Sequence, residues 1–323
     1  MVHRKGAWIE VWPLQGHNLG KIETSSDNEL NRIKLNRELS EHVEKLWVPK
    51  SAKGWKSSWV PFIRRLSFDS NQTVSIHGGA MAFKEIDGIN QAIENEMPIV
   101  SPDLSYNPCL SVGFLTATKD GKVIFQRRAQ NVHCPNMLIH EPCGYMTSMA
   151  FAPRAECDKP EHATDSRLFD INAQLDDRKR EIAETFGVPK ELVSYHPEQD
   201  FLGCGWKTIE TYFSTTGKID ADSRDLKLPE KQEVFFVPFE HLKELIYNQG
   251  RLSRVNPEGY RPSNYREIPL IDESLIGLVY GYERMTGDKL DIPQTIDRLN
   301  RDGLEIKVHD TSPGKSYDFP NSF

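Results

Sequence analysis

REIAETFGV, residues 180–188, is the stretch of sequence that decides the fold. Apolar side chains recur at helical offsets up to and within it: Ile171, Leu175, Ile182 and Phe186. Gly187 follows where a helix would end, because glycine adopts the left-handed backbone of a helix C-terminus without strain. The sequence therefore predicts a helix over residues 171–186 with one apolar face.

Acidic side chains follow another face of this predicted helix: Asp177, Glu181 and Glu184. Their spacing of i, i+4 and i+7 places them on one side of the helix. One interpretation is a solvated surface on which nearby arginines form ion pairs worth ~0.2 to 0.5 kcal/mol each. The other interpretation is a site for a metal ion or a phosphate. The residues of the helix alone favour the solvated surface.

Strand and turn signals surround the helix. Residues 111–118 and 122–126 predict a hairpin, because two apolar or β-branched runs flank a turn that contains Gly121. Further downstream we predict a strand at residues 234–238 and helices at residues 239–249, 275–285 and 292–299. The chain is therefore predicted to be α/β, of the α+β type.

The N-terminal part has weaker signals. They predict strands at residues 8–12 and 74–77 and helices at residues 29–47 and 85–95. Gly78 and Gly79 predict a turn, and the prolines within residues 97–108 predict an extended crossing between domains. We therefore expect an N-terminal α/β domain of unknown role at residues 1–104, a main domain at 105–290, and a C-terminal helix with a flexible tail at 291–323.

Composition limits the classes of function. The chain has 323 residues, of which 38% are hydrophobic, enough for a substantial core. Its net charge of -7, from 40 basic and 47 acidic residues, gives no general attraction for nucleic acid or anionic lipid. No apolar run approaches the roughly 20 residues of a membrane span, and the first residues lack the apolar core of a secretory signal. We expect a cytoplasmic protein with no nucleic-acid or membrane partner.

Cysteine and histidine spacing gives no metal motif. The five cysteines lack paired spacings, which argues against a disulfide framework and against a zinc site of the usual thiolate pattern. His133, His140 and His162 show no ligand spacing and are interpreted as surface or core residues. For Cys143, a small buried side chain is a simpler interpretation than a reactive thiol. The spacing of the cysteines does not exclude a metal site built from histidine or carboxylate ligands.

Residues 180–188 resemble the second half of the Nudix box of the Nudix hydrolases, Arg-Glu-U-x-Glu-Glu-x-Gly-U, where U is apolar. Every position fits except Thr185, which stands in place of a glutamate. The order of the surrounding features is also similar to the order in that family. These features are the hairpin, the arginine pair at 127 and 128, the Pro-x-Gly turn at 142–144, and the strand that enters a helix at 234–245.

The resemblance implies a mixed sheet between helices and metal-dependent hydrolysis of a diphosphate linkage in a nucleoside diphosphate derivative, of the nucleotide sugar or ADP-ribose class. It implies Mg²⁺ or Mn²⁺ as the cofactor, ions that accept hard carboxylate oxygens. It also implies catalytic roles for Arg180, Glu181 and Glu184. Thr185 removes one of the two carboxylates that would share the metal, and the first half of the box departs from the pattern at residues 166 and 172.

Other side chains could complete such a site. The candidate metal ligands are Glu181, Glu184, Asp177 and Glu230, with Glu141 and Glu233 as alternatives. The candidate substrate-binding residues are Arg127 and Arg128, which can meet a phosphate through paired hydrogen bonds, and Gly144 in the Pro-x-Gly turn.

The alternative function is that of a catalytically degenerate module of the same fold, which binds a nucleotide or phosphate ligand without turnover. Thr185 is its main support. In both cases the expected partner is a small molecule that carries phosphate. The sequence leaves open whether the chain forms a homodimer.

Overall fold

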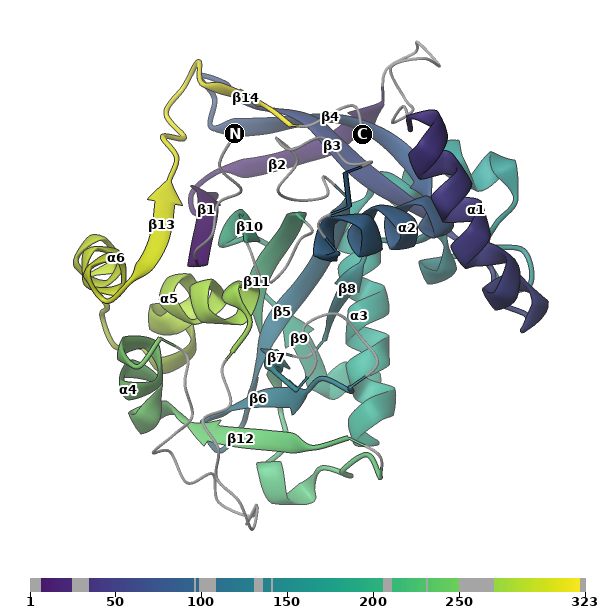
Figure 1. The fold of residues 1–323 in the computed structure, drawn as a ribbon. Coiled ribbons are helices and arrows are strands. Elements are labelled where there is room, and N and C mark those ends of the chain that lie inside the picture. Colours follow the sequence, from purple (N-terminus) through teal and green to yellow (C-terminus); the bar gives the residue numbers. More distant parts are fainter. Residues whose placement is uncertain are drawn as a thin grey trace.

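The computed structural model describes residues 7–24, 35–95, 97–98, 109–130, 136–140, 142–205, 211–230, 232–249 and 270–319. Within these ranges the chain is a mixed α/β protein with two β-sheets and flanking helices (Figure 1). Most of the expected interdomain crossing, together with His133 and Glu141, lies outside the described residues. Among the described helices, none combines the length and the apolar character needed to cross a bilayer.

The larger sheet joins both ends of the chain to its middle. Its main strands are β1 (Ala7–Pro13), β5 (Leu110–Thr118), β6 (Lys122–Arg127), β10 (Phe201–Gly205), β11 (Thr211–Ile219), β12 (Val234–Pro238) and β13 (Leu304–Val308). They lie in the order β12-β6-β5-β11-β10-β1-β13, and β7 (Leu138–His140), β8 (Cys143–Tyr145) and β9 (Val193–Tyr195) pair beside them. The β5–β11 and β1–β13 pairs are parallel and the others are antiparallel, so the sheet is mixed.

Alternate residues of the central strand β5 enter two different cores. Val112 and Phe114 pack in the core that contains Ile182 of helix α3 (Ile171–Phe186), whereas Leu115 packs with Ile276 of helix α5 (Asp272–Thr286). This alternation follows from the pleat of a strand, which sends successive side chains to opposite faces. The mixed sheet therefore lies between helices, with α3 and α5 on opposite faces (Figure 1), and the predicted fold class is confirmed.

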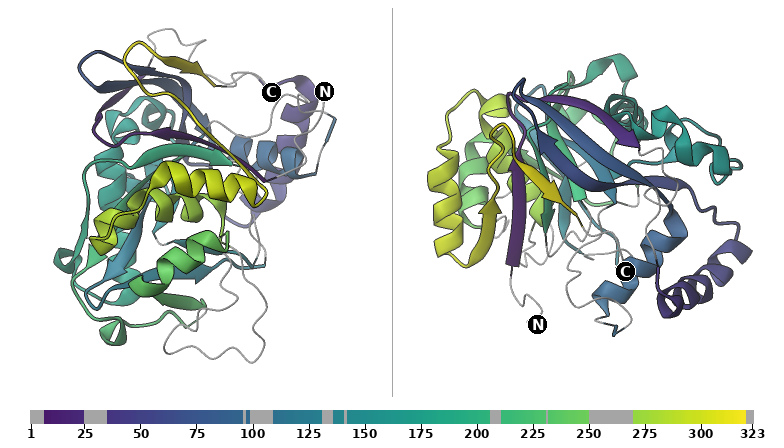
Figure 2. Two further views of the ribbon diagram at one scale, coloured as in Figure 1. Left: turned by 90° about the vertical axis from the view of Figure 1, so that its left-hand side faces the viewer. Right: turned by 90° about the horizontal axis from the view of Figure 1, so that it is seen from above.

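The smaller sheet lies above the larger one in the view of Figure 1 and contains β2 (Asn18–Thr24), β3 (Trp59–Phe68), β4 (Thr73–Ala82) and β14 (Ser316–Asp318) in the order β14-β3-β4-β2. Helices α1 (Arg37–Ala52) and α2 (Phe83–Glu94) lie beside it (Figure 2). Leu39 and Ile86 from these helices share a core with Phe62 of β3. The predicted hairpin of β5 and β6 and the predicted helices α2, α3 and α5 are present, as is the last helix, α6 (Ile292–Arg301).

The predicted turn at Gly78 and Gly79 is wrong, because both glycines lie inside β4. A Cβ atom at position 78 would stand 1.9 Å from the carbonyl oxygen of Phe62 on β3. Glycine is therefore needed at this position for the close approach of two strands rather than for a turn.

Two predicted helices have different bounds. Helix α1 begins at Arg37 instead of residue 29, because the side chain of Asn36 caps it by accepting a hydrogen bond from the backbone N–H of Leu39 at 2.8 Å. Residues 29–34 lie outside the described ranges. The helix predicted at residues 239–249 is shorter, since α4 spans Leu242–Tyr247 and follows a 3₁₀ turn.

The C-terminal tail is more ordered than predicted. Ser316–Asp318 forms β14 against β3, and Phe319 is 5% exposed. The rings of Tyr317 and Phe319 lie 5.9 and 5.2 Å from the ring of Trp12, which supplies the apolar contact that a tail alone lacks. The division at residue 104 stays a prediction, although strand pairing crosses it, because β1 pairs with both β10 and β13.

Candidate functional site

Helix α3 positions the residues of the predicted site. It begins after Asp170, whose side chain accepts a hydrogen bond from the backbone N–H of Asn172 at 3.0 Å, and it ends at Gly187 with φ of 65°. Ile182 and Phe186 are each 1% exposed, so the predicted apolar face is the buried one. The charged face is consequently directed away from the core that α3 shares with the sheet.

Arg178 joins helix α3 to strand β8. Its Nη1 donates to Glu181 Oε2 at 2.5 Å, and its Nη2 donates to the carbonyl oxygen of Tyr145 at 2.8 Å. Gly144 lies against the guanidinium, since a Cβ there would be in ordinary contact with Nη1, at 3.4 Å. The side chain of Arg178 is 10% exposed and that of Glu181 is 47% exposed. The structure thus brings two predicted residues, Gly144 and Glu181, to one place and holds the Glu181 carboxylate near a backbone carbonyl.

Arg180 lies between two acids on the exposed side of α3. It donates to Asp177 Oδ1 at 2.5 Å and to both carboxylate oxygens of Glu184 at 3.0 Å. These hydrogen bonds, that of Asp177 first, hold the pKa of the Arg180 guanidinium above its usual value. Glu184 is 66% exposed and Asp177 only 12%. Exposed ion pairs are worth ~0.2 to 1 kcal/mol, so the Glu184 carboxylate can turn toward another cation at small cost.

Thr185 is half-buried one helical turn after Glu181. A hydroxyl therefore stands where the pattern has a second carboxylate. Of the acids on this side of the helix, Glu181 is bound by the buried Arg178, and Asp177 and Glu184 are bound by Arg180.

The remaining predicted residues do not belong to helix α3. Arg127, the last residue of β6, forms an ion pair with Glu233 at 2.9 Å. Phe125, two residues earlier, lies in the core beneath α5, so strand alternation directs Arg127 to the α5 side, away from α3. Arg128 is half-buried after β6, and Glu230 is exposed in the turn before β12.

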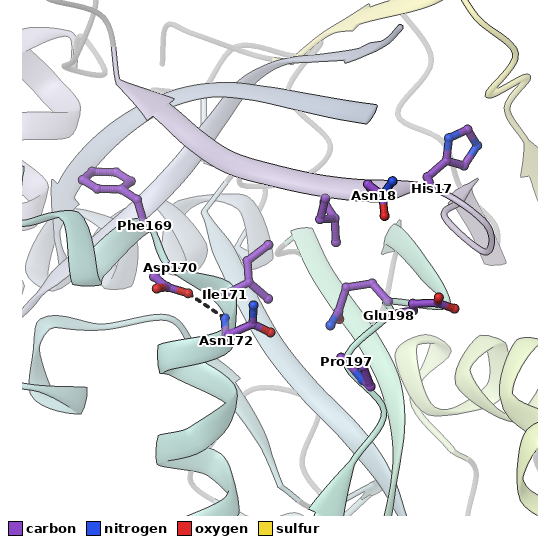
Figure 3. A pocket seen from close by; sticks show the side chains of 10 residues that line it. His17, Asn18, Phe169, Asp170, Ile171, Asn172, Pro197 and Glu198 are labelled. Carbon is purple, nitrogen blue, oxygen red and sulfur yellow. Dashed lines mark hydrogen bonds between the residues drawn. The ribbon is translucent and has the colours of Figure 1, made fainter. Parts of the chain in front are cut away.

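A cavity of about 410 Å³ lies at the start of α3 (Figure 3). Polar side chains line it: His17, Asn18, Asp170, Asn172, Glu198 and Gln199. Gln199 is 1% exposed, and its side-chain amide makes no hydrogen bond within the described residues. Because Asp170 places a carboxylate at the helix N-terminus, the cavity suits an uncharged polar group better than a phosphate. Asn172 and Glu181 are about two and a half helical turns apart, so this cavity is separate from the Glu181 side of α3.

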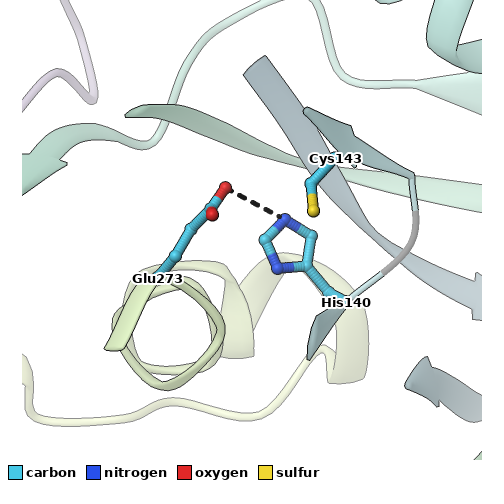
Figure 4. Close-up of side chains that lie close together, drawn as sticks. All are labelled: His140, Cys143 and Glu273. Atoms are coloured by element: carbon cyan, nitrogen blue, oxygen red, sulfur yellow. Dashed lines mark ion pairs between the residues drawn. The ribbon is translucent and has the colours of Figure 1, made fainter. Parts of the chain in front are cut away.

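Three residues that the sequence reasoning did not connect lie together on the α5 face: His140, Cys143 and Glu273 (Figure 4). One nitrogen, the sulfur and one carboxylate oxygen lie within 4.8 Å of one another. His140 and Glu273 are fully buried, and Cys143 is half-buried. Burial lowers the pKa of His140 to about 3, so its imidazole is neutral.

The sequence carried one signal for this cluster. Residues 272–274, Asp-Glu-Ser, open an apolar helix with three polar side chains, and all three are buried. Acidic and hydroxyl side chains are common at helix starts, so this signal is weak in the sequence, and only their burial in the structure is unusual.

No family model and no curated protein matches the chain. Among solved structures, a Nudix hydrolase from M. smegmatis, RenU, is similar at 16% sequence identity, over 61% of this chain and 92% of that chain, with a TM-score of 0.28. A protein from Deinococcus radiodurans is similar at 16% identity, over 45% of this chain and 77% of that chain, with a TM-score of 0.26.

Proposed function

We propose that the chain is a metal-dependent hydrolase of the Nudix type that cleaves a diphosphate linkage in a nucleoside diphosphate derivative. The observation that carries the proposal is the position of Glu181, whose half-exposed carboxylate is held by Arg178 beside the carbonyl oxygen of Tyr145. The resemblance of residues 180–188 to the Nudix box supplies the reaction class and the substrate class, nucleotide sugars and ADP-ribose.

The donor atoms on this side of α3 fit a hard cation. Glu181 would hold Mg²⁺ or Mn²⁺ together with Glu184, which needs only to leave an exposed ion pair with Arg180. When bound, the metal neutralises phosphate charge and activates water. Arg180 then remains anchored by Asp177, at 2.5 Å, and keeps a positive charge next to the phosphate-binding side of the helix.

A second function is favoured by a specific observation. The buried guanidinium of Arg178 already neutralises Glu181, and Thr185 contributes no second carboxylate. Both features weaken a metal site and favour a module that binds a phosphate ligand without turnover.

A hydrolysis screen over ADP-ribose and nucleotide sugars, with and without Mg²⁺ or Mn²⁺, tests the proposed enzyme. We expect metal-dependent product release that Glu181→Gln abolishes while the protein stays folded, because the amide removes an anionic ligand and keeps the size. Glu191→Gln is the matched control, since Glu191 is exposed beyond the end of α3. Equal hydrolysis by the parent and Glu181→Gln would remove Glu181 from the reaction.

Thr185→Glu separates the two functions. It restores a carboxylate pair at i and i+4 with Glu181, so an enzyme should gain Mg²⁺ affinity and hydrolyse faster. In a binding module the added charge should weaken the binding of ADP-ribose without producing turnover. Mg²⁺ affinity, ADP-ribose affinity and product release are measured for both proteins. A parent that neither hydrolyses nor binds these ligands excludes both functions.

A further inference from the structure

Pairing within the larger sheet brings His140 and Cys143 to its α5 face. His140 on β7 pairs with Phe125 on β6, and Phe125 lies in the core beneath α5. Cys143 on β8 pairs with Gly113 on β5. Gly113 has the same parity as Leu115, which also lies in the α5 core, so Cys143 faces α5 as well.

Glu273 reaches the same place from the first turn of α5. The positive end of the helix macrodipole lies at this turn, beside the carboxyl group of Glu273. A nitrogen, a sulfur and an oxygen from three separate elements thus converge within 4.8 Å. Figure 4 shows the sulfur of Cys143 and the carboxylate of Glu273 directed toward the ring of His140.

The imidazole of His140 is oriented by Ser274. Ser274 Oγ accepts a hydrogen bond from the backbone N–H of His140 at 2.9 Å, and it also lies 2.9 Å from Nδ1 of the His140 ring. When Nδ1–H donates to this Oγ, the lone pair of Nε2 points into the cluster. Nε2 is buried and makes no hydrogen bond within the described residues, and it lies 3.5 Å from Glu273 Oε1. A histidine that binds a metal through one ring nitrogen regularly donates a hydrogen bond from the other ring nitrogen, as Nδ1 can to Ser274 here.

The arrangement is not that of a nucleophilic relay. A thiol, an imidazole and a carboxylate act in series only when the thiol meets one ring nitrogen and the carboxylate meets the other. Here Ser274 holds Nδ1, and the carboxylate of Glu273 is directed to Nε2. Ligands of one zinc ion stand roughly 3 to 4 Å apart, which the distance from Nε2 to Oε1 already satisfies.

We propose that His140, Cys143 and Glu273 bind one divalent ion of the zinc class. A thiolate and a carboxylate balance the two positive charges, and the mixture of sulfur, nitrogen and oxygen donors selects Zn²⁺ or Co²⁺ over Mg²⁺. Three protein ligands leave a fourth position for water, on the side where Cys143 is half-exposed. The site is on the opposite face of the sheet from Glu181 and does not depend on the proposed hydrolysis.

Metal titration of the full chain tests the site. The protein is kept reduced with a phosphine, since thiol reductants compete for zinc. We expect one Zn²⁺ per chain by elemental analysis, and Co²⁺ should give a thiolate-to-cobalt charge-transfer band. Cys143→Ser should abolish this band, and Ser274→Ala, which loosens the imidazole, should weaken Zn²⁺ binding by about 10- to 100-fold. Cys157→Ser is the matched control, because this buried thiol is outside the cluster, and it should bind like the parent. A parent without the band, or a band that survives Cys143→Ser, overturns the proposal.

A second measurement needs no variant. Iodoacetamide should modify Cys143 in the metal-free parent, and Zn²⁺ should slow this reaction at least tenfold while Mg²⁺ leaves it unchanged. Peptide mass spectrometry reads Cys143 separately from the buried Cys109, Cys157 and Cys204. Equal modification rates with and without Zn²⁺ would overturn the site and would leave the proposed hydrolysis standing.

Discussion

Replacing Arg178 with methionine tests how helix α3 is held to strand β8. Methionine keeps an unbranched side chain in the buried position but removes the donors to Tyr145 and Glu181. The charge-assisted hydrogen bond to the Tyr145 carbonyl is worth about 1.5 to 3 kcal/mol. The ion pair adds at most about 1 kcal/mol, because the Glu181 side chain is 47% exposed.

Burying Nε of Arg178 costs free energy, because this atom makes no hydrogen bond within the described residues. This cost offsets part of the stabilisation from the other two contacts. We therefore expect Arg178→Met to lower the free energy of unfolding by about 2 kcal/mol. Urea unfolding followed by circular dichroism measures this change, with the slope against urea concentration checked for equality with the parent.

Arg180→Met is the matched control, because Arg180 lies on the same helix and also pairs with two acceptor residues. Both pairs join residues one turn apart on the same helix and are worth about 0.2 to 0.5 kcal/mol each, so together they should contribute no more than about 1 kcal/mol. Equal losses of stability in the two variants would refute the reasoning that Arg178 ties α3 to β8 through buried contacts.

Three further predictions concern the fold. Phe186→Ala should cost about 3 to 5 kcal/mol, because this ring is 1% exposed against the sheet; an unchanged melting temperature would contradict its place in the core. Gly78→Ala should cost at least about 1 to 3 kcal/mol in urea unfolding, since its Cβ would meet the Phe62 carbonyl oxygen at 1.9 Å, and parent-like stability would show that the strands can separate there. Burial raises the pKa of Asp200 to about 6 in the folded chain. Between about pH 4 and pH 6 the unfolded chain therefore binds fewer protons than the folded chain, so the free energy of unfolding should fall as the pH rises through this range. Asp200→Asn should remove that decrease, and parallel pH profiles of the two proteins would exclude it.

Local signals predicted the part of the fold that local interactions determine. Helix α3 was predicted with its observed bounds because apolar spacing and the stop at Gly187 agree. The hairpin of β5 and β6 was predicted for a similar reason, with its glycine turn at Gly121. Neighbouring residues determine local structure of this kind.

Long-range pairing accounts for what was missed. β14 looked like a polar tail, because its order depends on β3 and on Trp12, both far away in the sequence. The same cause hid the cluster of His140, Cys143 and Glu273, whose members share no spacing and meet only when β7, β8 and α5 pack together. The acids and arginines of α3 were visible in the sequence, but the buried contact of Arg178 with Tyr145 was not, since it needs β8 to lie beside the helix.

Strand β8 makes neighbours of two surfaces that the sheet otherwise separates. Cys143 faces α5, and Gly144, the next residue, lies against Arg178 on the α3 side. If an ion bound by Cys143 moved the backbone of β8, the movement would reach Arg178 through Gly144 and Tyr145, and Arg178 holds the carboxylate of Glu181. Affinity at either surface would then depend on occupancy of the other, and the dependence would be equal in both directions, because linkage between two equilibria is reciprocal.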